Sequence, residues 1–169
     1  MIIRAMTPND GDAVIDIYGR AIAGGNATFQ ENAGSWESWD QGHLDDCRFV
    51  ACNALGRVIG WAGLSGVSNR CVYRGVAEIS VYVDPDAQGQ GIGKALLAAL
   101  IAESEAQDIW SLEAGIFPEN TASVALHRSL GFQDVGLRRG LGRMTYGPFA
   151  GKWRDVLLMQ RRSSVVGVE

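Results

Sequence analysis

The sequence predicts an α/β (α+β) fold in a single domain, and three observations lead to it. The chain has 169 residues of which 47% are apolar, enough for one hydrophobic core, since domains of about 100–200 residues are the norm. Runs rich in β-branched residues alternate with stretches of helical pattern. A glycine turn at residues 88–93 joins a strand to a helix. We expect a domain over residues 1–162 and a mobile tail over residues 163–169.

Composition narrows the class of protein. The formal net charge of −4 makes nucleic acid an unexpected partner, because affinity for nucleic acid comes mostly from clustered Lys and Arg. The three cysteines, Cys47, Cys52 and Cys71, form no C-x-x-C motif, which indicates reduced thiols and no metal site. Neither a signal peptide nor an apolar run of about 18 residues is present, so we expect a cytoplasmic protein with no membrane partner.

The first part of the chain predicts two helices. Thr7 can cap a helix whose first position is Pro8, and the glycine pair at residues 24–25 ends it. Residues 26–32 have no period and indicate a loop. A second helix is expected to begin at Ser35 and to carry three apolar side chains toward the core: Trp36, Trp39 and Cys47.

Three strands are expected next. Residues 49–52 and 58–64 are apolar runs separated by a turn at 53–56, which predicts a hairpin. Residues 76–83 form a β-branched and aromatic strand, and Asp84-Pro85 ends it because proline lacks a backbone donor.

The second half alternates helices and strands. Residues 95–107 are rich in Ala and Leu and predict a helix, followed by a strand at 109–117. Asn120 or Thr121 opens another helix, which Gly131 ends as a C-terminal cap. The last expected strand covers residues 155–160.

The glycine turn can aim several backbone N–H groups at an anion in front of a helix N-terminus. A Walker A loop does not fit, because Gln88 and Ala95 stand where that motif needs Gly and Ser or Thr. The dinucleotide fingerprint fails as well, because Lys94 occupies the position of its third glycine. By itself the turn is also compatible with a glycine-rich helix start that binds nothing.

Further motifs resolve this choice through a family resemblance. With Asn120 and residues 126–132 (LHRSLGF), the glycine turn resembles the GNAT superfamily of N-acetyltransferases. Residues 78–83 (EISVYV), 120–123 (NTAS) and 151–155 (GKWRD) are similar to its phosphinothricin and methionine sulfoximine acetyltransferase branch. The resemblance covers nearly the entire chain.

Two residues depart from the pattern of that branch. Ile79 replaces a His that is common after the Glu, and Arg154 replaces a His or Leu between Trp and Asp. Both lie beside motif residues and bear on the choice of substrate.

The resemblance implies a mixed, mostly antiparallel central sheet with flanking helices, splayed near Tyr82 to admit acetyl-CoA as co-substrate. It also implies a homodimer. A backbone N–H near Tyr82 or Val83 would polarise the thioester. The residues expected at the coenzyme are Val81, Tyr82, Val83, Gln88, Gly89, Gln90, Gly91, Ile92, Gly93, Lys94, Asn120 and Ser123.

Two residues are expected to be catalytic. Glu78 is the candidate base that takes a proton from the amine; its alternatives are a structural salt bridge with Arg74 or another cation, and a position facing solvent. His127 could protonate the leaving thiolate or bind the pantetheine arm, and its alternative is core packing. Asn120 could equally be a plain helix cap.

The acceptor is expected to be a small amine with an anionic or polar head. Arg70 and Arg74 match carboxylate or phosphinate geometry, and the resemblance makes Phe29 an aromatic wall of the amine pocket. An ordinary charged loop is the alternative for the two arginines. Cys71 has no local histidine to lower its pKa, so direct transfer is favoured over an acetyl-enzyme.

The expected function is acetyl-CoA-dependent N-acetylation of an amino acid of the phosphinothricin, methionine sulfoximine or methionine sulfone type. Two alternatives remain: the same chemistry on a protein N-terminus, a polyamine or an aminoglycoside, and an acyl-CoA-binding sensor without turnover.

Overall fold

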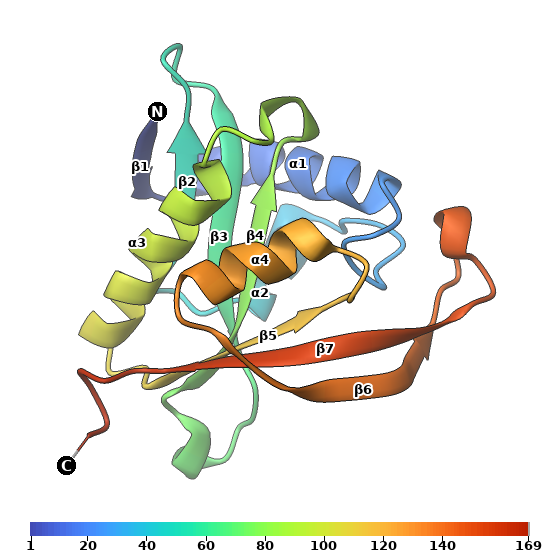
Figure 1. Cartoon of the computed structure of the whole chain (residues 1–169). Coiled ribbons are helices and arrows are strands. Elements are labelled where there is room, and N and C mark those ends of the chain that lie inside the picture. The colour runs from blue at the N-terminus through green and yellow to red at the C-terminus, as the bar shows by residue number, and fades with distance from the viewer. Residues whose placement is uncertain (169) are drawn as a thin grey trace.

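The fold is one seven-stranded sheet with helices on both faces, as a computed structural model of the chain shows (Figure 1). The structure describes residues 1–168. The strand order is β1-β2-β3-β4-β5-β7-β6; the β4–β5 pair is parallel and the other neighbouring pairs are antiparallel. The elements are β1 (Ile2–Ala5), α1 (Gly11–Ala23), α2 (Trp36–Gly42), β2 (Phe49–Cys52), β3 (Val58–Gly66), β4 (Val76–Val83), α3 (Ile92–Ala106), β5 (Ser111–Ile116), α4 (Thr121–Ser129), β6 (Gln133–Arg143) and β7 (Trp153–Arg162).

Two apolar clusters cover the two faces of the sheet. On one face the buried leucines of α3, among them Leu96 and Leu100, pack against Leu64 of β3. On the other face Trp61 of β3 packs with Val14 of α1 and other buried residues. Because side chains alternate along a strand, β3 serves both clusters, and seven of its nine residues are buried.

Most predicted elements are confirmed, with shifted ends. Ser35 caps α2 as expected, since its hydroxyl accepts a hydrogen bond from the Ser38 backbone at 3.2 Å. The prediction that Cys47 lies on this helix was wrong, because α2 ends at Gly42 and Cys47 has a φ of 60°. The Arg48 guanidinium bonds the carbonyls of Asp40, His43 and Leu44 and so closes the end of the helix.

The third helix begins earlier than predicted. Gly91, with a φ of 76°, is its N-cap and Ile92 its first residue, so the last residues of the glycine turn form the first turn of α3. The first helix starts later, because Pro8–Asp10 form a 3-10 turn ahead of α1.

Two strands were not predicted, and both lie at edges of the sheet. β1 has only four residues. β6 is long and carries Gly136, Gly140 and Gly142 within it; its pairing with β7 is irregular around the first two. An edge strand that is exposed along its length has no alternation of buried and exposed residues, so its sequence shows no strand period.

The predicted tail is anchored where it starts. Ser163 is buried, and its hydroxyl donates to the Glu105 carboxylate at 2.8 Å. Mobility of the residues after it stays a prediction, and Glu169 lies outside the described residues. No helix of the described chain is long and apolar enough to cross a membrane.

Asp10 anchors the entry into α1. Its buried carboxylate accepts hydrogen bonds from the Arg4 guanidinium at 2.7 and 2.8 Å and from the Thr7 backbone at 2.8 Å. The Arg4 hydrogen bonds, with further help from Thr7, lower the pKa of Asp10 to about 2. The stabilisation is therefore complete above the unfolded pKa of about 3.9 and is lost as the pH falls through about 2.

We expect Asp10→Asn to lower the free energy of unfolding by about 1 kcal/mol at pH 7, because Arg4 is partly exposed and the pair is screened. The difference in the free energy of unfolding between the wild type and the variant should shrink as the pH is lowered from about 4 toward 2. Urea unfolding at a series of pH values measures it. Asp12→Asn, on the exposed side of the same turn, is the control. A deficit that stayed constant down to the lowest pH would contradict this account.

Candidate functional site

A cavity of about 760 Å³ lies where β4 and β5 separate. It brings together most of the predicted site: Phe29, Glu78, Val81, Tyr82, Val83, Gln88, Gly89, Gly91, Ile92, Gly93, Lys94, Asn120, Ser123 and His127. Gln90, Arg70 and Arg74 are not among the residues that line it. We call this space the site cavity.

The separation of the two strands is visible in their register. β4 and β5 pair over Val76–Glu78 and Ser111–Glu113, and the pairing stops there. Beyond Glu78, the edge of β4 that faces β5 has no strand partner within residues 1–168, while its other edge stays paired with β3 through Val83. Backbone polar groups away from water need partners, so this edge is suited to hydrogen-bond an extended ligand.

The glycine turn leads from the end of β4 into α3. Gly89 and Gly91 have φ values of 77° and 76°, a conformation that other residues rarely adopt, and the space where their side chains would be is open. Successive backbone N–H groups in such a turn, at the start of a 15-residue helix, form an anion site. The turn therefore fits a diphosphate group.

Gly93 has a different reason to be glycine. A Cβ there would approach Leu126 of α4 to 3.1 Å, so the residue lets α3 and α4 lie close together above the cavity.

Glu78 lies on the cavity wall at the last paired position of β4, beside Glu113 of β5. Burial raises the pKa of its carboxyl group, Glu113 raises it further, and the charge of Arg138 lowers it. Among the described residues Glu78 forms no salt bridge with Arg74 or with another cation, so a structural ion pair does not account for it. A carboxylate with a raised pKa in a cavity is a typical general base.

His127 is buried on α4 and also lines the cavity. Its Nδ1 lies 2.8 Å from the Ser123 carbonyl oxygen, which can only accept, so Nδ1 carries the proton. Burial lowers the pKa of His127, and the ring packs edge-on against Phe132 at 5.0 Å. In this neutral form Nε2 has a lone pair and no hydrogen, so it can accept a hydrogen bond but not donate one.

Asn120 is a helix cap that also faces the cavity. Its side-chain oxygen accepts from the Ser123 backbone at 3.3 Å, and its amide donates to the Asn26 carbonyl at 3.4 Å. Both polar ends of the side chain are thus engaged within the protein.

Tyr82 contributes to the core through its side chain. The ring lies 4.8 Å from those of Tyr18 and Trp61, so any contact with a ligand at this position falls to its backbone.

Residues 25–30, the acceptor loop, close one end of the cavity and carry Phe29. The ring of Phe29 meets Phe117 edge-on at 4.9 Å and lies over Gly142, where a Cβ would come within 2.8 Å of it. The turn between β6 and β7 holds this loop: the Tyr146 hydroxyl donates to the Thr28 carbonyl at 2.6 Å, and Pro148 packs directly on Gly25.

Arg154 is the centre of this arrangement. It is buried, and its guanidinium bonds Asn26 at 2.6 Å, Glu119 at 3.0 Å and the Gly25 carbonyl at 3.3 Å. The same group lies 3.7 Å from the ring centre of Phe117 and 4.1 Å from that of Phe149. The residue that departs from the family pattern therefore ties the acceptor loop to β7.

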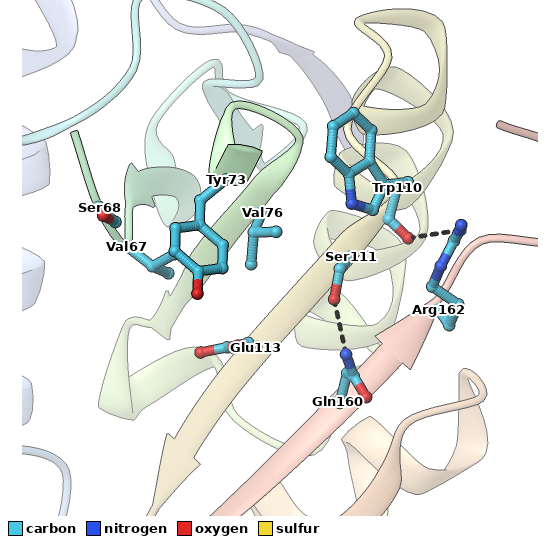
Figure 2. Close-up of a pocket in the computed structure, with 9 residues that line it drawn as sticks. All are labelled: Val67, Ser68, Tyr73, Val76, Trp110, Ser111, Glu113, Gln160 and Arg162. Carbon is cyan, nitrogen blue, oxygen red and sulfur yellow. Dashed lines mark hydrogen bonds between the residues drawn. The ribbon is translucent and has the colours of Figure 1, made fainter. Parts of the chain in front are cut away.

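Arg70 and Arg74 are placed elsewhere, contrary to the expectation that they belong with the other site residues. Arg70 lies over Tyr73 at 5.5 Å and Arg74 over Trp110 at 5.6 Å. Tyr73 and Trp110 line a second cavity of about 440 Å³, together with Glu113, Gln160 and others (Figure 2). The loop that carries the two arginines precedes β4 and borders this second cavity, since its residues Val67, Ser68 and Tyr73 line it.

Sequence reasoning missed several residues of the site. Arg138 and Val156 line the site cavity from β6 and β7, and Tyr146 holds the acceptor loop. None has a local signal, since Arg138 and Val156 arrive through long-range strand pairing and Tyr146 lies in the connection between the two paired strands. Among the described residues, no group of three or more His, Cys, Asp or Glu side chains could hold a metal ion.

The splayed sheet, the glycine turn and the carboxylate beside them define the class of acyl-coenzyme A acyltransferases. The description "Acetyltransferase (GNAT) family" matches residues 18–132, more than half of the chain, so this protein belongs to that family.

Two relatives and two solved structures show where in the family the chain lies. The phosphinothricin N-acetyltransferase of Alcaligenes faecalis is 32% identical over 94% of this chain and 81% of its own length. The L-methionine sulfoximine/L-methionine sulfone acetyltransferase of Pseudomonas paraeruginosa is 39% identical over 66% of this chain and 62% of its own length. The expected resemblance is confirmed.

The structures agree in fold. The phosphinothricin acetyltransferase of Sinorhizobium meliloti, solved in complex with AcCoA, has a TM-score of 0.86 at 32% identity, covering 98% of this chain and 90% of its own. The ribosomal-protein-alanine N-acetyltransferase of Brucella melitensis has a TM-score of 0.85 at 34% identity, covering 96% and 100%.

We expect Arg154→Leu to release the acceptor loop. The change removes three hydrogen bonds from a buried cation and should lower the free energy of unfolding by about 2–3 kcal/mol. Amide hydrogen exchange should speed up in residues 25–30 more than in β3 or β4. Arg143→Leu, which removes a single exposed bond to the Gly151 carbonyl, is the control. Unchanged exchange in the loop would show that Arg154 does not hold it.

Proposed function

We propose that the protein transfers the acetyl group of acetyl-CoA directly to the amino group of a small amino-acid-like acceptor. The observation that carries this proposal is a single cavity that joins the anion-binding glycine turn, the unpaired edge of β4 and the carboxylate of Glu78. The names of the relatives make phosphinothricin, methionine sulfoximine and methionine sulfone the first acceptors to test.

The coenzyme would be held mainly by backbone groups. The diphosphate would lie at residues 88–93, in front of α3, where the helix dipole favours negative charge. The pantetheine arm would run along the free edge of β4, and an N–H near Tyr82 or Val83 would polarise the thioester carbonyl. This assigns Val81, Tyr82 and Val83 to the coenzyme without requiring any particular side chain there.

Glu78 would accept the proton of the amine, directly or through a water. An alkylammonium group with a pKa near 8–10 is mostly protonated at neutral pH, and only the free amine attacks. Raising the pKa of the carboxyl group reduces the difference between its pKa and that of the amine, and this makes the proton transfer easier. Holding amine and thioester together supplies much of the remaining rate.

Water rather than His127 would protonate the departing thiolate. The neutral ring has its one N–H bonded to the Ser123 carbonyl, so His127 has no proton to give. Its Nε2 would instead accept a hydrogen bond from an N–H of the pantetheine arm. Of the two functional roles that the sequence suggested for His127, this proposal takes the hydrogen bond to the pantetheine arm and leaves the proton transfer to water.

Glu78→Gln should lower kcat/KM for the amine by about 10²–10⁴-fold, because the base is lost, while calorimetry finds unchanged affinity for acetyl-CoA. In the wild type, activity should fall on the acid side through a pKa above the usual glutamate value of about 4.3, since burial raises it. The variant should lose that limb of the pH profile. Unchanged turnover in the variant would remove Glu78 from the mechanism, and a wild type that binds acetyl-CoA without releasing thiol would favour the sensor alternative.

His127→Phe tests the role of the imidazole. If Nε2 is only an acceptor, KM for acetyl-CoA should rise by about fivefold to tenfold, as expected for one hydrogen bond, and kcat should change little. Steady-state kinetics and a thermal melt of the same sample separate this effect from a loss of folding. A fall in kcat of more than about 100-fold in a folded variant would show that His127 is the acid after all.

A homodimer in the cytoplasm is the proposed state of the protein. Supporting it, β6 is an exposed edge strand, and it and the start of β7 carry four exposed large apolar side chains: Val135, Leu137, Leu141 and Trp153. Unpaired strand edges with apolar side chains favour association. Sedimentation equilibrium of the wild type and of Leu137→Glu would decide the point, since a charge on this edge should shift a dimer toward monomer.

A further inference from the structure

Arg138 was absent from the predicted site, yet it lines the site cavity. In the β6–β7 ladder it stands opposite Val156, which also lines the cavity, so both side chains lie on the same face of the sheet. Side chains alternate along β7, so Gln160 lies on the same face as Val156, and Glu113 of β5, which pairs with Gln160, lies there too. Glu113 in turn pairs with Glu78 of β4, which adds Glu78 to this face. Glu78 and Arg138 therefore lie on the same face of the sheet.

The cations that line the cavity divide between its two parts. Lys94 stands on the first turn of α3, next to the glycine turn. Arg138 stands on β6, on the face of the sheet that it shares with Glu78, and among the described residues it has no ion-pair partner. Arg138 and Glu78 line the same cavity, and the charge of Arg138 lowers the pKa of that carboxyl group.

We propose that Arg138 binds the carboxylate of the acceptor and makes the enzyme select α-amino acids over simple amines; this inference rests on the proposed function. An α-amino acid carries its amine and carboxylate on one carbon, so an acid and an arginine that face one cavity match its two ends. A guanidinium offers a carboxylate two parallel hydrogen bonds and stays charged at every relevant pH. The wall formed by Phe29 and Val156 would contact the side chain of the amino acid.

Binding of the carboxylate would also strengthen the base. Free Arg138 opposes the rise in the pKa of Glu78 that burial and Glu113 cause. An acceptor carboxylate paired with Arg138 offsets its positive charge and leaves burial dominant. Glu78 then becomes more basic when an amino acid is in place, and a simple amine gives no such effect.

Arg70 and Arg74 are the rival candidates for this role. Both lie beside the second cavity, stacked on aromatic rings, and neither lines the site cavity. The second cavity, which Figure 2 shows, shares no lining residue with the site cavity; Glu113 of the second cavity is the register partner of Glu78. The positions of the three arginines thus favour Arg138 as the residue that binds the carboxylate.

The test compares methionine sulfone with the amine that lacks its carboxyl group. In thiol-release assays of the full-length protein, the wild type should prefer the amino acid by at least about 100-fold in kcat/KM. Arg138→Gln should reduce this preference to below about tenfold, chiefly through a higher KM for the amino acid, and leave KM for acetyl-CoA unchanged. Arg139→Gln, at an exposed neighbour that does not line the cavity, is the matched control and should keep the wild-type preference.

The possible outcomes separate the inference from the function on which it rests. If Arg138→Gln keeps the preference, or if Arg70→Gln or Arg74→Gln abolishes it instead, Arg138 is not the carboxylate site. A wild type that acetylates both compounds equally would overturn the inference and leave the acetyl transfer intact. A wild type that releases no thiol with either compound, or with a wider panel of amines, would mean that the proposed function itself has failed.

Discussion

The early end of the β4–β5 pairing is the constraint on which the rest of the site depends. A central strand normally has both edges satisfied by neighbours, and leaving one edge free next to an apolar interior costs free energy for every unpaired backbone group. Here the cost falls on the segment after Glu78, between the glycine turn and the carboxylate. The structure thus contains, in its own backbone, one half of a hydrogen-bonded ladder, and a linear thioester carrier would supply the other half.

The two faces of the opened sheet have different partners. On one face α3 and α4 border the gap, and with them the glycine turn and His127. On the other face, α1 and the acceptor loop lie next to Glu78, Phe29 and Arg138. Coenzyme and acceptor would therefore enter from opposite sides and meet at the gap, which keeps the charged groups of one away from those of the other.

The sequence was informative where function depends on neighbouring residues. The glycine turn, the strand before it and the cap at Asn120 are local, and each was predicted close to its actual position. Glu78 was identifiable because a carboxylate within an apolar strand is unusual. His127 was identifiable only through the resemblance, and its tautomer needed the geometry of the helix.

Features built by distant segments could not be predicted. β6 has glycines at its irregular positions and no buried face, so only its pairing with β7 makes it a strand. Arg138 is an exposed residue that only this pairing places in the lining of the site cavity, and Arg70 and Arg74 looked suitable because they precede β4 in sequence. Closeness along the chain was misleading there, because both guanidinium groups stack on aromatic rings, Tyr73 and Trp110, that line the second cavity.

The anchoring of the acceptor loop by Arg154 and Tyr146 has a consequence for biosynthesis. Residues 25–30 leave the ribosome early, but the groups that fix them belong to the final hairpin. Because β7 also lies between β5 and β6, the sheet and the end of the cavity formed by residues 25–30 are completed together, when the last strand is in place. Translation of nearly the whole chain must therefore precede the assembly of this end of the cavity.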